Sequence, residues 1–162
     1  LAVVWFDQHF KNLINWAETS PFFWQPSNVD GATTRGLELT GSLNYGLVSI
    51  RGNWTFLDAT DDADGSRLIR RAKESGSITV GLGFSDVHAE VQMDITGPRF
   101  SGSGNSQPMS GYRKSDVRIT YVVNDIWKLK FRMENIEDKT YEEVAGYGVS
   151  GRAAYFGVSA TF

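Results

Sequence analysis

Apolar and polar residues alternate with a period of two along most of this chain. In the last segment, Phe156, Val158 and Ala160 lie on one side of the chain, and small or polar residues lie between them. The same alternation runs through residues 37–45, 48–57, 78–84, 87–95, 117–123 and 127–134. Such a pattern is typical of β-strands whose two faces meet different surroundings. It therefore predicts an all-β protein.

Tight turns are expected at three places between these strands, at Gly46-Leu47, at Ser85-Asp86 and around Asn124-Asp125. Their first residues are 39 positions apart in both intervals, 85−46 and 124−85. Longer polar connections, rich in Gly, Ser and Asp, are expected at residues 58–75, 96–115 and 138–151. The chain thus reads as a repeated antiparallel hairpin with short turns on one edge and long loops on the other.

Strand length decides between lipid and water as the solvent of the apolar face. A soluble sandwich or barrel also has one wet and one dry face, but its strands usually have about 5–6 residues. Residues 48–57 would rise roughly 23 Å at about 45° tilt, close to the apolar band of a membrane barrel. Aromatic residues at both ends of the strands, Tyr45, Phe84, Trp127 and Phe162 at one and Trp54 and Phe56 at the other, fit interfacial girdles. We predict an up-and-down transmembrane β-barrel wall of about eight strands.

Composition excludes several classes of function but does not identify the function itself. The chain has 162 residues, 41% of them hydrophobic, a net charge of −3 and no cysteine, which argues against a disordered chain, a disulfide framework and a cysteine-ligated metal. The two histidines, His9 and His88, lack catalytic or metal-ligand spacing, and an acidic sequence pI near 5.4 argues against nucleic-acid binding. We expect neither an enzyme nor a cofactor. The opening LAVVWFDQHF lacks an initiator Met and a signal peptide, so we expect a fragment of a longer chain.

The stretch MENIEDKTYEEVAGYGVSGRAAYFGVSATF resembles the carboxy-terminal signature of TonB-dependent outer-membrane receptors. The matching residues are Asn135, Asp138, Lys139, Tyr141, Gly146, Tyr147, Gly151, Arg152 and Phe162. Upstream, Arg35, Gly36, Glu38 and Gly41 resemble the family's Arg-Gly-x-Glu-x-x-Gly strand, and NWTFLDA is similar to another family segment. Ile136 and Glu137 depart from the usual Leu and Phe, which predicts a less well anchored turn.

The resemblance implies that residues 1–162 are the last eight strands of a barrel of about 22 strands. The plug domain and the energy-coupling segment that contacts TonB are missing from this sequence. The family's function would be import of a scarce small-molecule nutrient across the outer membrane. Arg-Arg-Ala-Lys at 70–73 and the Asp-Lys-x-Tyr-Glu-x-Val-x-Gly-Tyr run at 138–147 look most like the cobalamin receptors. A catecholate-type ferric siderophore receptor is the alternative, and other classes are a small structural or adhesin barrel and a soluble lipid-binding barrel.

Strand parity assigns one set of charged residues to the inner, lumen face, toward the plug. These are Glu38, Arg51, Glu90, Asp94, Arg118, Lys128, Lys130 and Arg132. If Tyr121 opposes Leu129, Arg118 lies opposite Arg132, and such like charges need counter-charge. We expect Glu90, Asp94 and acidic plug groups to supply it, or a water-filled lumen to screen the charges.

The long loops hold the candidate contacts to ligand and lipopolysaccharide. Arginines and aromatic residues there could contact an anionic or planar ligand, and the candidates are Arg67, Arg70, Arg71, Tyr112 and Arg113. The acidic run of Asp58, Asp61, Asp62 and Asp64 invites a calcium hypothesis, but Thr60 and Arg71 occupy positions where an EF-hand needs acids. A solvated acidic loop is therefore the preferred interpretation, with calcium shared with lipopolysaccharide as the alternative.

The final strand also resembles an outer-membrane assembly signal. Gly157, Ala160 and Phe162 fit the pattern Gly-x-x-Φ-x-Φ, in which Φ is an apolar residue. The resemblance implies that the barrel-insertion machinery reads this strand. The physical requirement is a last strand with an apolar outer face that can pair with its neighbour in lipid.

Overall fold

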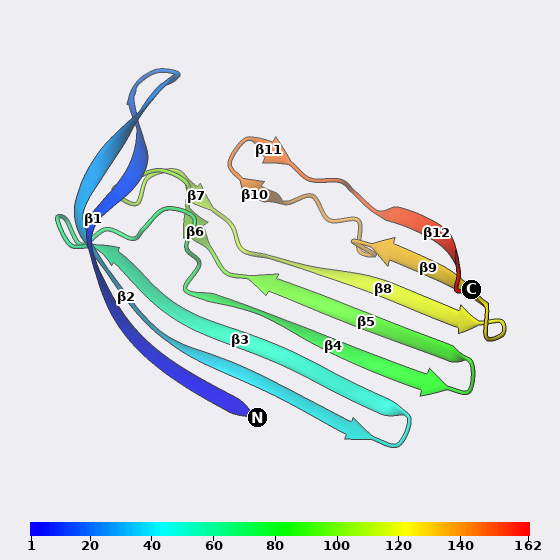
Figure 1. Ribbon diagram of the computed structural model, residues 1–162. Helices are drawn as coiled ribbons and strands as arrows, with labels where there is room; N and C mark the ends of the chain where they lie inside the picture. Colours follow the sequence, from blue (N-terminus) through cyan, green and yellow to red (C-terminus); the bar gives the residue numbers. More distant parts are fainter.

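The computed structural model is dominated by one curved, antiparallel sheet of eight strands (Figure 1). It describes residues 1–162, apart from the side chains of residues 13, 15, 17–19 and 27–30. The strands, in sheet order, are β1 (Ala2–Ser20), β2 (Phe23–Tyr45), β3 (Val48–Asp61), β4 (Glu74–Phe84), β5 (Val87–Thr96), β8 (Tyr112–Val122), β9 (Trp127–Glu134) and β12 (Ala153–Ala160). No helix in the described part of the chain is both long and apolar enough to cross a membrane.

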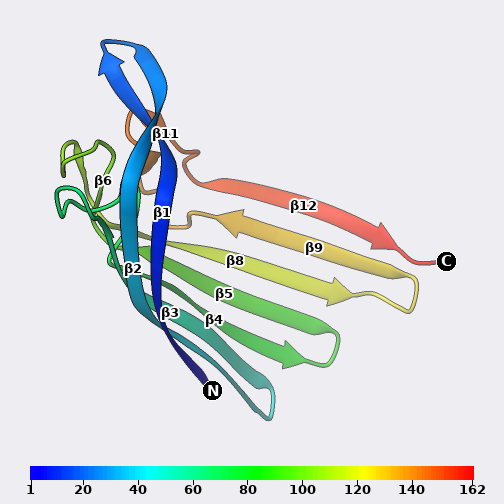
Figure 2. The same ribbon diagram turned by 60° about the vertical axis from the view of Figure 1, so that its left-hand side comes forward.

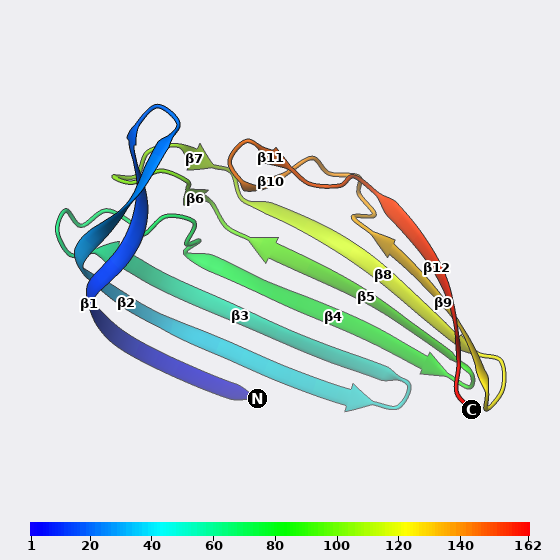
Figure 3. The ribbon, with the colours of Figure 1, turned by 45° about the horizontal axis from the view of Figure 1, so that its top comes forward.

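The sheet is open rather than closed on itself. Each strand pairs with the next along the sheet, and across the described backbone β1 and β12 each pair on one side only. Figures 1 and 3 show the curved sheet with β1 and β12 at its two borders. The eight strands therefore form a wall with two unpaired edges.

The three predicted tight turns are confirmed. Gly46 and Ser85 have positive φ angles of 57° and 49°, which tight two-residue turns require. In the third turn, the Asn124 side-chain Oδ1 accepts hydrogen bonds from the backbone N–H groups of Ile126 at 3.0 Å and Trp127 at 2.9 Å. These turns align the short edge of the wall, and they fix the register of the hairpins.

The opposite edge differs from the sequence prediction in two ways. β3 continues to Asp61 and β4 begins at Glu74, so the first polar connection is shorter than residues 58–75. β1 and β2 form a hairpin that projects well beyond the rest of the sheet (Figure 2), which the alternation pattern did not reveal. The second and third connections hold two small sheets, β6 (Arg99–Phe100) with β7 (Pro108–Met109) and β10 (Glu142–Val144) with β11 (Tyr147–Gly148).

The register keeps one face of the wall apolar from strand to strand. Ile50 lies opposite Val80, Val91 opposite Val117, and Phe131 lies between Ile119 and Phe156. Apolar side chains on this face are largely exposed, with Phe156 84% exposed. The buried apolar residues in the described part of the chain are only Ala32, Ala59 and Met109. The wall therefore has an apolar face of the kind that lipid covers, in place of a core.

Candidate functional site

The connections at the long-loop edge are tied into one cluster. We name them loop 1 (residues 62–73), loop 2 (97–111) and loop 3 (135–152). The backbone N–H of Arg70 donates to the carbonyl of Phe100 at 2.7 Å, and the N–H of Arg67 donates to the Asn105 side chain at 3.0 Å. These bonds join loop 1 to loop 2, so loop 2 is held from one side by its neighbour.

Arg99 joins loop 2 to loop 3. Its side chain is buried, and its Nη2 donates to the carbonyl oxygens of Glu142 at 2.7 Å and Glu143 at 3.1 Å. The guanidinium carbon also lies 5.5 Å from the centre of the Tyr112 ring, within cation–π range. One arginine of loop 2 thus contacts both loop 3 and the start of β8.

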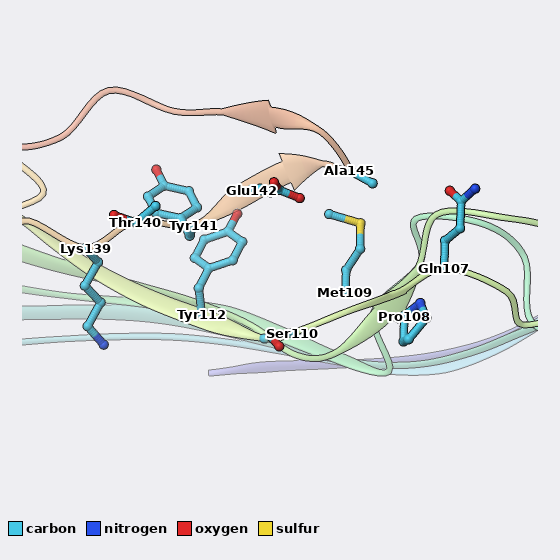
Figure 4. A pocket seen from close by; sticks show the side chains of 11 residues that line it. Gln107, Pro108, Met109, Ser110, Tyr112, Lys139, Thr140, Tyr141, Glu142 and Ala145 are labelled. Carbon is cyan, nitrogen blue, oxygen red and sulfur yellow. The ribbon is translucent and has the colours of Figure 1, made fainter. Parts of the chain in front are cut away.

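A cleft of about 510 Å³ opens between loops 2 and 3 (Figure 4). Tyr112, at the start of β8, stacks with Tyr141 of loop 3, with ring centres 4.2 Å apart. Figure 4 shows these two rings side by side at one end, with Met109 and Gln107 at the other. The volume lies in the range that small-molecule sites occupy. The cleft is the candidate functional site.

The chemistry of the cleft is aromatic and hydrogen-bonding, with balanced charge. Its charged lining residues, among those described, are Lys139 and Glu142, one of each sign. Burial raises the pKa of the Tyr141 phenol. Four neutral side chains supply further hydrogen-bond donors and acceptors along the lining: Tyr112, Ser110, Thr140 and Gln107.

The base of loop 3 is held by the residues of the carboxy-terminal signature. Asn135 is buried; its Nδ2 donates to the Lys139 carbonyl and its Oδ1 accepts from the Lys139 N–H, both at 2.9 Å. The carboxylate of Asp138 accepts the backbone N–H of Arg152 at 2.8 Å. The structure thus gives two signature residues a role in shaping the loop that carries Tyr141.

The expectation that Glu137 weakens this turn is wrong. Its carboxylate accepts the Ser115 hydroxyl at 2.7 Å and the Ser115 backbone N–H at 2.9 Å, and the Ile136 N–H donates to the Ser115 carbonyl at 2.9 Å. The hydroxyl bond, together with the N–H bond, lowers the pKa of Glu137. A polar anchor to β8 therefore takes the place of the apolar residue common in the family pattern.

One of the five ligand-contact candidates lines the cleft. Tyr112 is that residue. Arg113 follows it in β8 and therefore points to the other face of the sheet, where it lies opposite Ile95 on β5. Arg67 and Arg70 join the loops through their backbone N–H groups, and Arg71 is exposed. Sequence reasoning missed Arg99 and the pairing of Tyr141 with Tyr112. The signature that contains Tyr141 was a usable signal, but nothing in the sequence sets Arg99 apart.

The inner-face residues form ion pairs along the wall. Arg51 contacts Glu90 at 2.6 Å, and Lys114 lies 3.4 Å from Asp94 and 2.9 Å from Asp116. The expected counter-ions Glu90 and Asp94 therefore pair with Arg51 and Lys114, a lysine that sequence reasoning missed.

The predicted opposition of Arg118 and Arg132 is present in the register. Arg118 donates to Gln92 at 2.9 Å, while Arg132 contacts Glu134 at 3.3 Å and the Tyr155 ring at 4.5 Å. For Glu38, Lys128 and Lys130, no ion pair occurs among the described side chains. The uncompensated cations thus gather on β9, toward the short-turn edge.

The acidic candidates for calcium do not converge on one point. Asp61 and Asp64 accept the backbone N–H groups of Ala63 and Ser66, while Asp62 accepts the Thr33 hydroxyl. Asp58 lies in β3, opposite Arg35. No group of three metal-binding side chains occurs in the described residues. The carboxylates instead shape loop 1 and its contact with β2.

The final strand, β12, forms one border of the open wall. In β12, Gly157 lies opposite Lys130 and Ala160 opposite Trp127. The Phe162 ring meets the Trp127 ring edge-on, with centres 6.4 Å apart. The apolar residues of the assembly pattern thus stand at the short-turn edge, on the same side as Trp127.

Comparison with known proteins gives consistent matches. The model of the family described as "TonB dependent receptor-like, beta-barrel" matches residues 1–136. The chain is 28% identical over 158 residues to the vitamin B12 transporter of Photobacterium profundum, and this alignment covers 95% of this chain and 26% of that protein. It is 29% identical over 139 residues to the vitamin B12 transporter of Vibrio vulnificus, and this alignment covers 85% of this chain and 22% of that protein. The chain spans about a quarter of the length of these relatives.

Solved structures share the fold. The copper transporter OprC superposes with a TM-score of 0.81 at 19% identity, over 99% of this chain and 26% of that one. The siderophore receptor PiuA from Acinetobacter baumannii superposes with a TM-score of 0.76 at 17% identity, over 98% and 25%. At these identities the likeness concerns the architecture of the wall alone.

Proposed function

Because the chain belongs to the family of TonB-dependent receptor β-barrels, we propose that it is the carboxy-terminal part of the barrel of a cobalamin transporter. The family consists of outer-membrane transport receptors rather than enzymes, so the chain is an outer-membrane protein. Its part in transport is to span the bilayer and to present loops that capture the nutrient.

The aromatic, charge-balanced lining of the cleft is the observation that favours cobalamin over a ferric catecholate as the ligand. Cobalamin is a large molecule whose rim consists of neutral amides, and hydrogen-bonding groups beside the stacked Tyr112 and Tyr141 suit such a rim. A ferric catecholate carries several negative charges and would call for a surplus of cations, but Lys139 is matched by Glu142 in the lining. The named relatives, both vitamin B12 transporters, support the same choice.

The open wall implies that further strands complete the barrel. Unpaired N–H and C=O groups cannot remain at sheet edges in lipid, and β1 and β12 each lack a partner on one side in the described sheet. This favours a wall segment over the self-contained structural or adhesin barrel. In the whole receptor, the uncompensated Lys128 and Lys130 would face acidic groups of a plug domain, and TonB would supply energy through the plug.

Equilibrium binding to the full-length receptor tests the ligand. We expect cyanocobalamin to bind, and Tyr141→Ala to weaken binding by roughly 10- to 100-fold because a central stacked aromatic is removed. Tyr147→Ala is the matched control, since Tyr147 is 73% exposed on the same loop and lies outside the cleft lining. Binding of a ferric catecholate in place of cobalamin would transfer the proposal to siderophores. A receptor that binds neither ligand would favour the structural barrel.

A further inference from the structure

Arg99 is a buried charge without a carboxylate partner. Its side chain is 5% exposed, and its hydrogen bonds go to the main-chain carbonyls of Glu142 and Glu143. Buried charges in proteins are normally paired with an opposite charge. Within the described residues, no ion pair involves Arg99. The positive charge therefore lacks the compensation that burial calls for.

One nitrogen of the same guanidinium also lacks an acceptor. Nη1 of Arg99 is the buried side-chain nitrogen or oxygen that makes no hydrogen bond in the described part of the chain. Leaving a buried charged donor unsatisfied costs more than leaving a neutral one. An acceptor for Nη1 would remove that cost, and an anionic oxygen would neutralise the charge as well.

Arg99 lies next to the cleft, because it contacts two of the residues that line it. Its guanidinium contacts the Tyr112 ring and the Glu142 carbonyl, and both residues line the cleft. The carbonyls that Arg99 contacts belong to β10, which pairs with β11 in a two-stranded ladder with a register shift and a turn at Gly146. Arg99 is not itself among the lining residues and Nη1 is buried, so Nη1 contacts a molecule in the cleft only when this hairpin is displaced.

We propose that Arg99 recognises a singly charged anionic oxygen group of the ligand, beside a flat ring held by the tyrosine pair. This inference rests on the proposed function, because cobalamin carries one phosphodiester in its nucleotide portion. Arg99 then has two roles: Nη2 holds loop 3, and Nη1 binds the phosphodiester. The remainder of the cleft, with its balanced lining, binds the neutral parts of the ligand.

Two corrinoids separate these roles in the full-length receptor. Cyanocobalamin has the phosphodiester, and dicyanocobinamide lacks the nucleotide portion that carries it. We expect wild-type receptor to bind cyanocobalamin about 10- to 100-fold more tightly, as a charged hydrogen bond allows. Arg99→Gln should reduce this ratio toward one, because cyanocobalamin binding weakens more than dicyanocobinamide binding, and measurable binding of dicyanocobinamide shows that the variant is folded. Arg113→Gln, on the opposite face of β8, should keep the wild-type ratio.

A second variant, Arg99→Lys, keeps the proposal testable if Arg99→Gln does not fold. Arg99→Lys keeps the charge, but its single ammonium cannot serve the loop 3 carbonyls and a phosphodiester in the fork geometry of arginine, so we expect the ratio to fall there too. If both variants weaken the two corrinoids equally, or keep the wild-type ratio, Arg99 is a structural clasp and the inference is overturned. If the wild type binds neither corrinoid, the proposed function fails, and this inference fails with it.

Discussion

At the scale of single residues, Glu137 shows how one substitution in a motif is compensated by a neighbour. Its carboxylate takes both the hydroxyl and the N–H of Ser115, on the adjacent strand β8. The family pattern has an apolar residue here, so the sequence alone indicated a weaker turn. What the sequence could not supply was the position of Ser115, because that depends on where β8 begins relative to loop 3.

This anchor predicts a pH dependence of loop 3. The Ser115 bonds lower the folded-state pKa of Glu137 below its ordinary value near 4.5, so their stabilisation is fully present above that value and is lost as pH falls through the lower folded pKa. Hydrogen–deuterium exchange of residues 135–152, corrected for intrinsic rates, should therefore increase as pH falls below about 4.5. Glu137→Gln should exchange faster at neutral pH and lose this dependence, whereas Glu143→Gln, exposed on the same loop, should behave like wild type. Identical profiles for the two variants would contradict the anchor.

At the scale of elements, β9 tests which face of the wall meets lipid. Phe131 lies between Ile119 and Phe156 on the apolar face, with its ring centre 5.0 Å from that of Phe156. Lys130, its neighbour, has the opposite parity and lies beside Thr120 and Gly157. The alternation in WKLKFRME was enough to predict both orientations, because a strand has a fixed side-chain period.

The expected consequence is a large difference between two substitutions in adjacent positions. Phe131→Arg should lower the free energy of unfolding by about 2–4 kcal/mol, as a lipid-facing arginine near the bilayer midplane does. Lys130→Ala should have a much smaller effect, because Lys130 forms no ion pair among the described side chains. Urea unfolding of the full-length receptor in lipid vesicles measures both. Equal losses would mean that the assignment of the faces is wrong.

The outer edge was less predictable than the strands. Strand alternation and turn residues predicted an antiparallel wall of about eight strands, its three tight turns and the opposition of Arg118 and Arg132, but not the projecting β1–β2 hairpin. The cleft depends on contacts between loops 2 and 3, which have no sequence periodicity. Of the lining residues, Tyr112 was identified by type and place. Arg99, which supports the cleft from outside its lining, was not identified, since its role arises from carbonyl groups of Glu142 and Glu143.

At the scale of the whole molecule, the wall has the properties of a part that functions only in a larger assembly. Its apolar face is exposed, and its two edge strands are unpaired on one side within the described sheet. On its inner face, Lys128 and Lys130 of β9 form no ion pair with any described side chain. Lipid, further strands and a plug would satisfy these three features respectively. The candidate cleft lies among the loops and the start of β8, consistent with the proposed division between a passive wall and a capturing edge.

Uptake of labelled cyanocobalamin by whole cells tests the central claim most directly. The full-length receptor would be expressed in Gram-negative cells that lack their own cobalamin receptor, with and without functional TonB. The account predicts accumulation of cobalamin that requires both the receptor and TonB, and that falls for Tyr141→Ala but not for Tyr147→Ala at equal receptor levels. Cells that express the receptor in the outer membrane but take up no cobalamin, or take it up without TonB, would contradict the account.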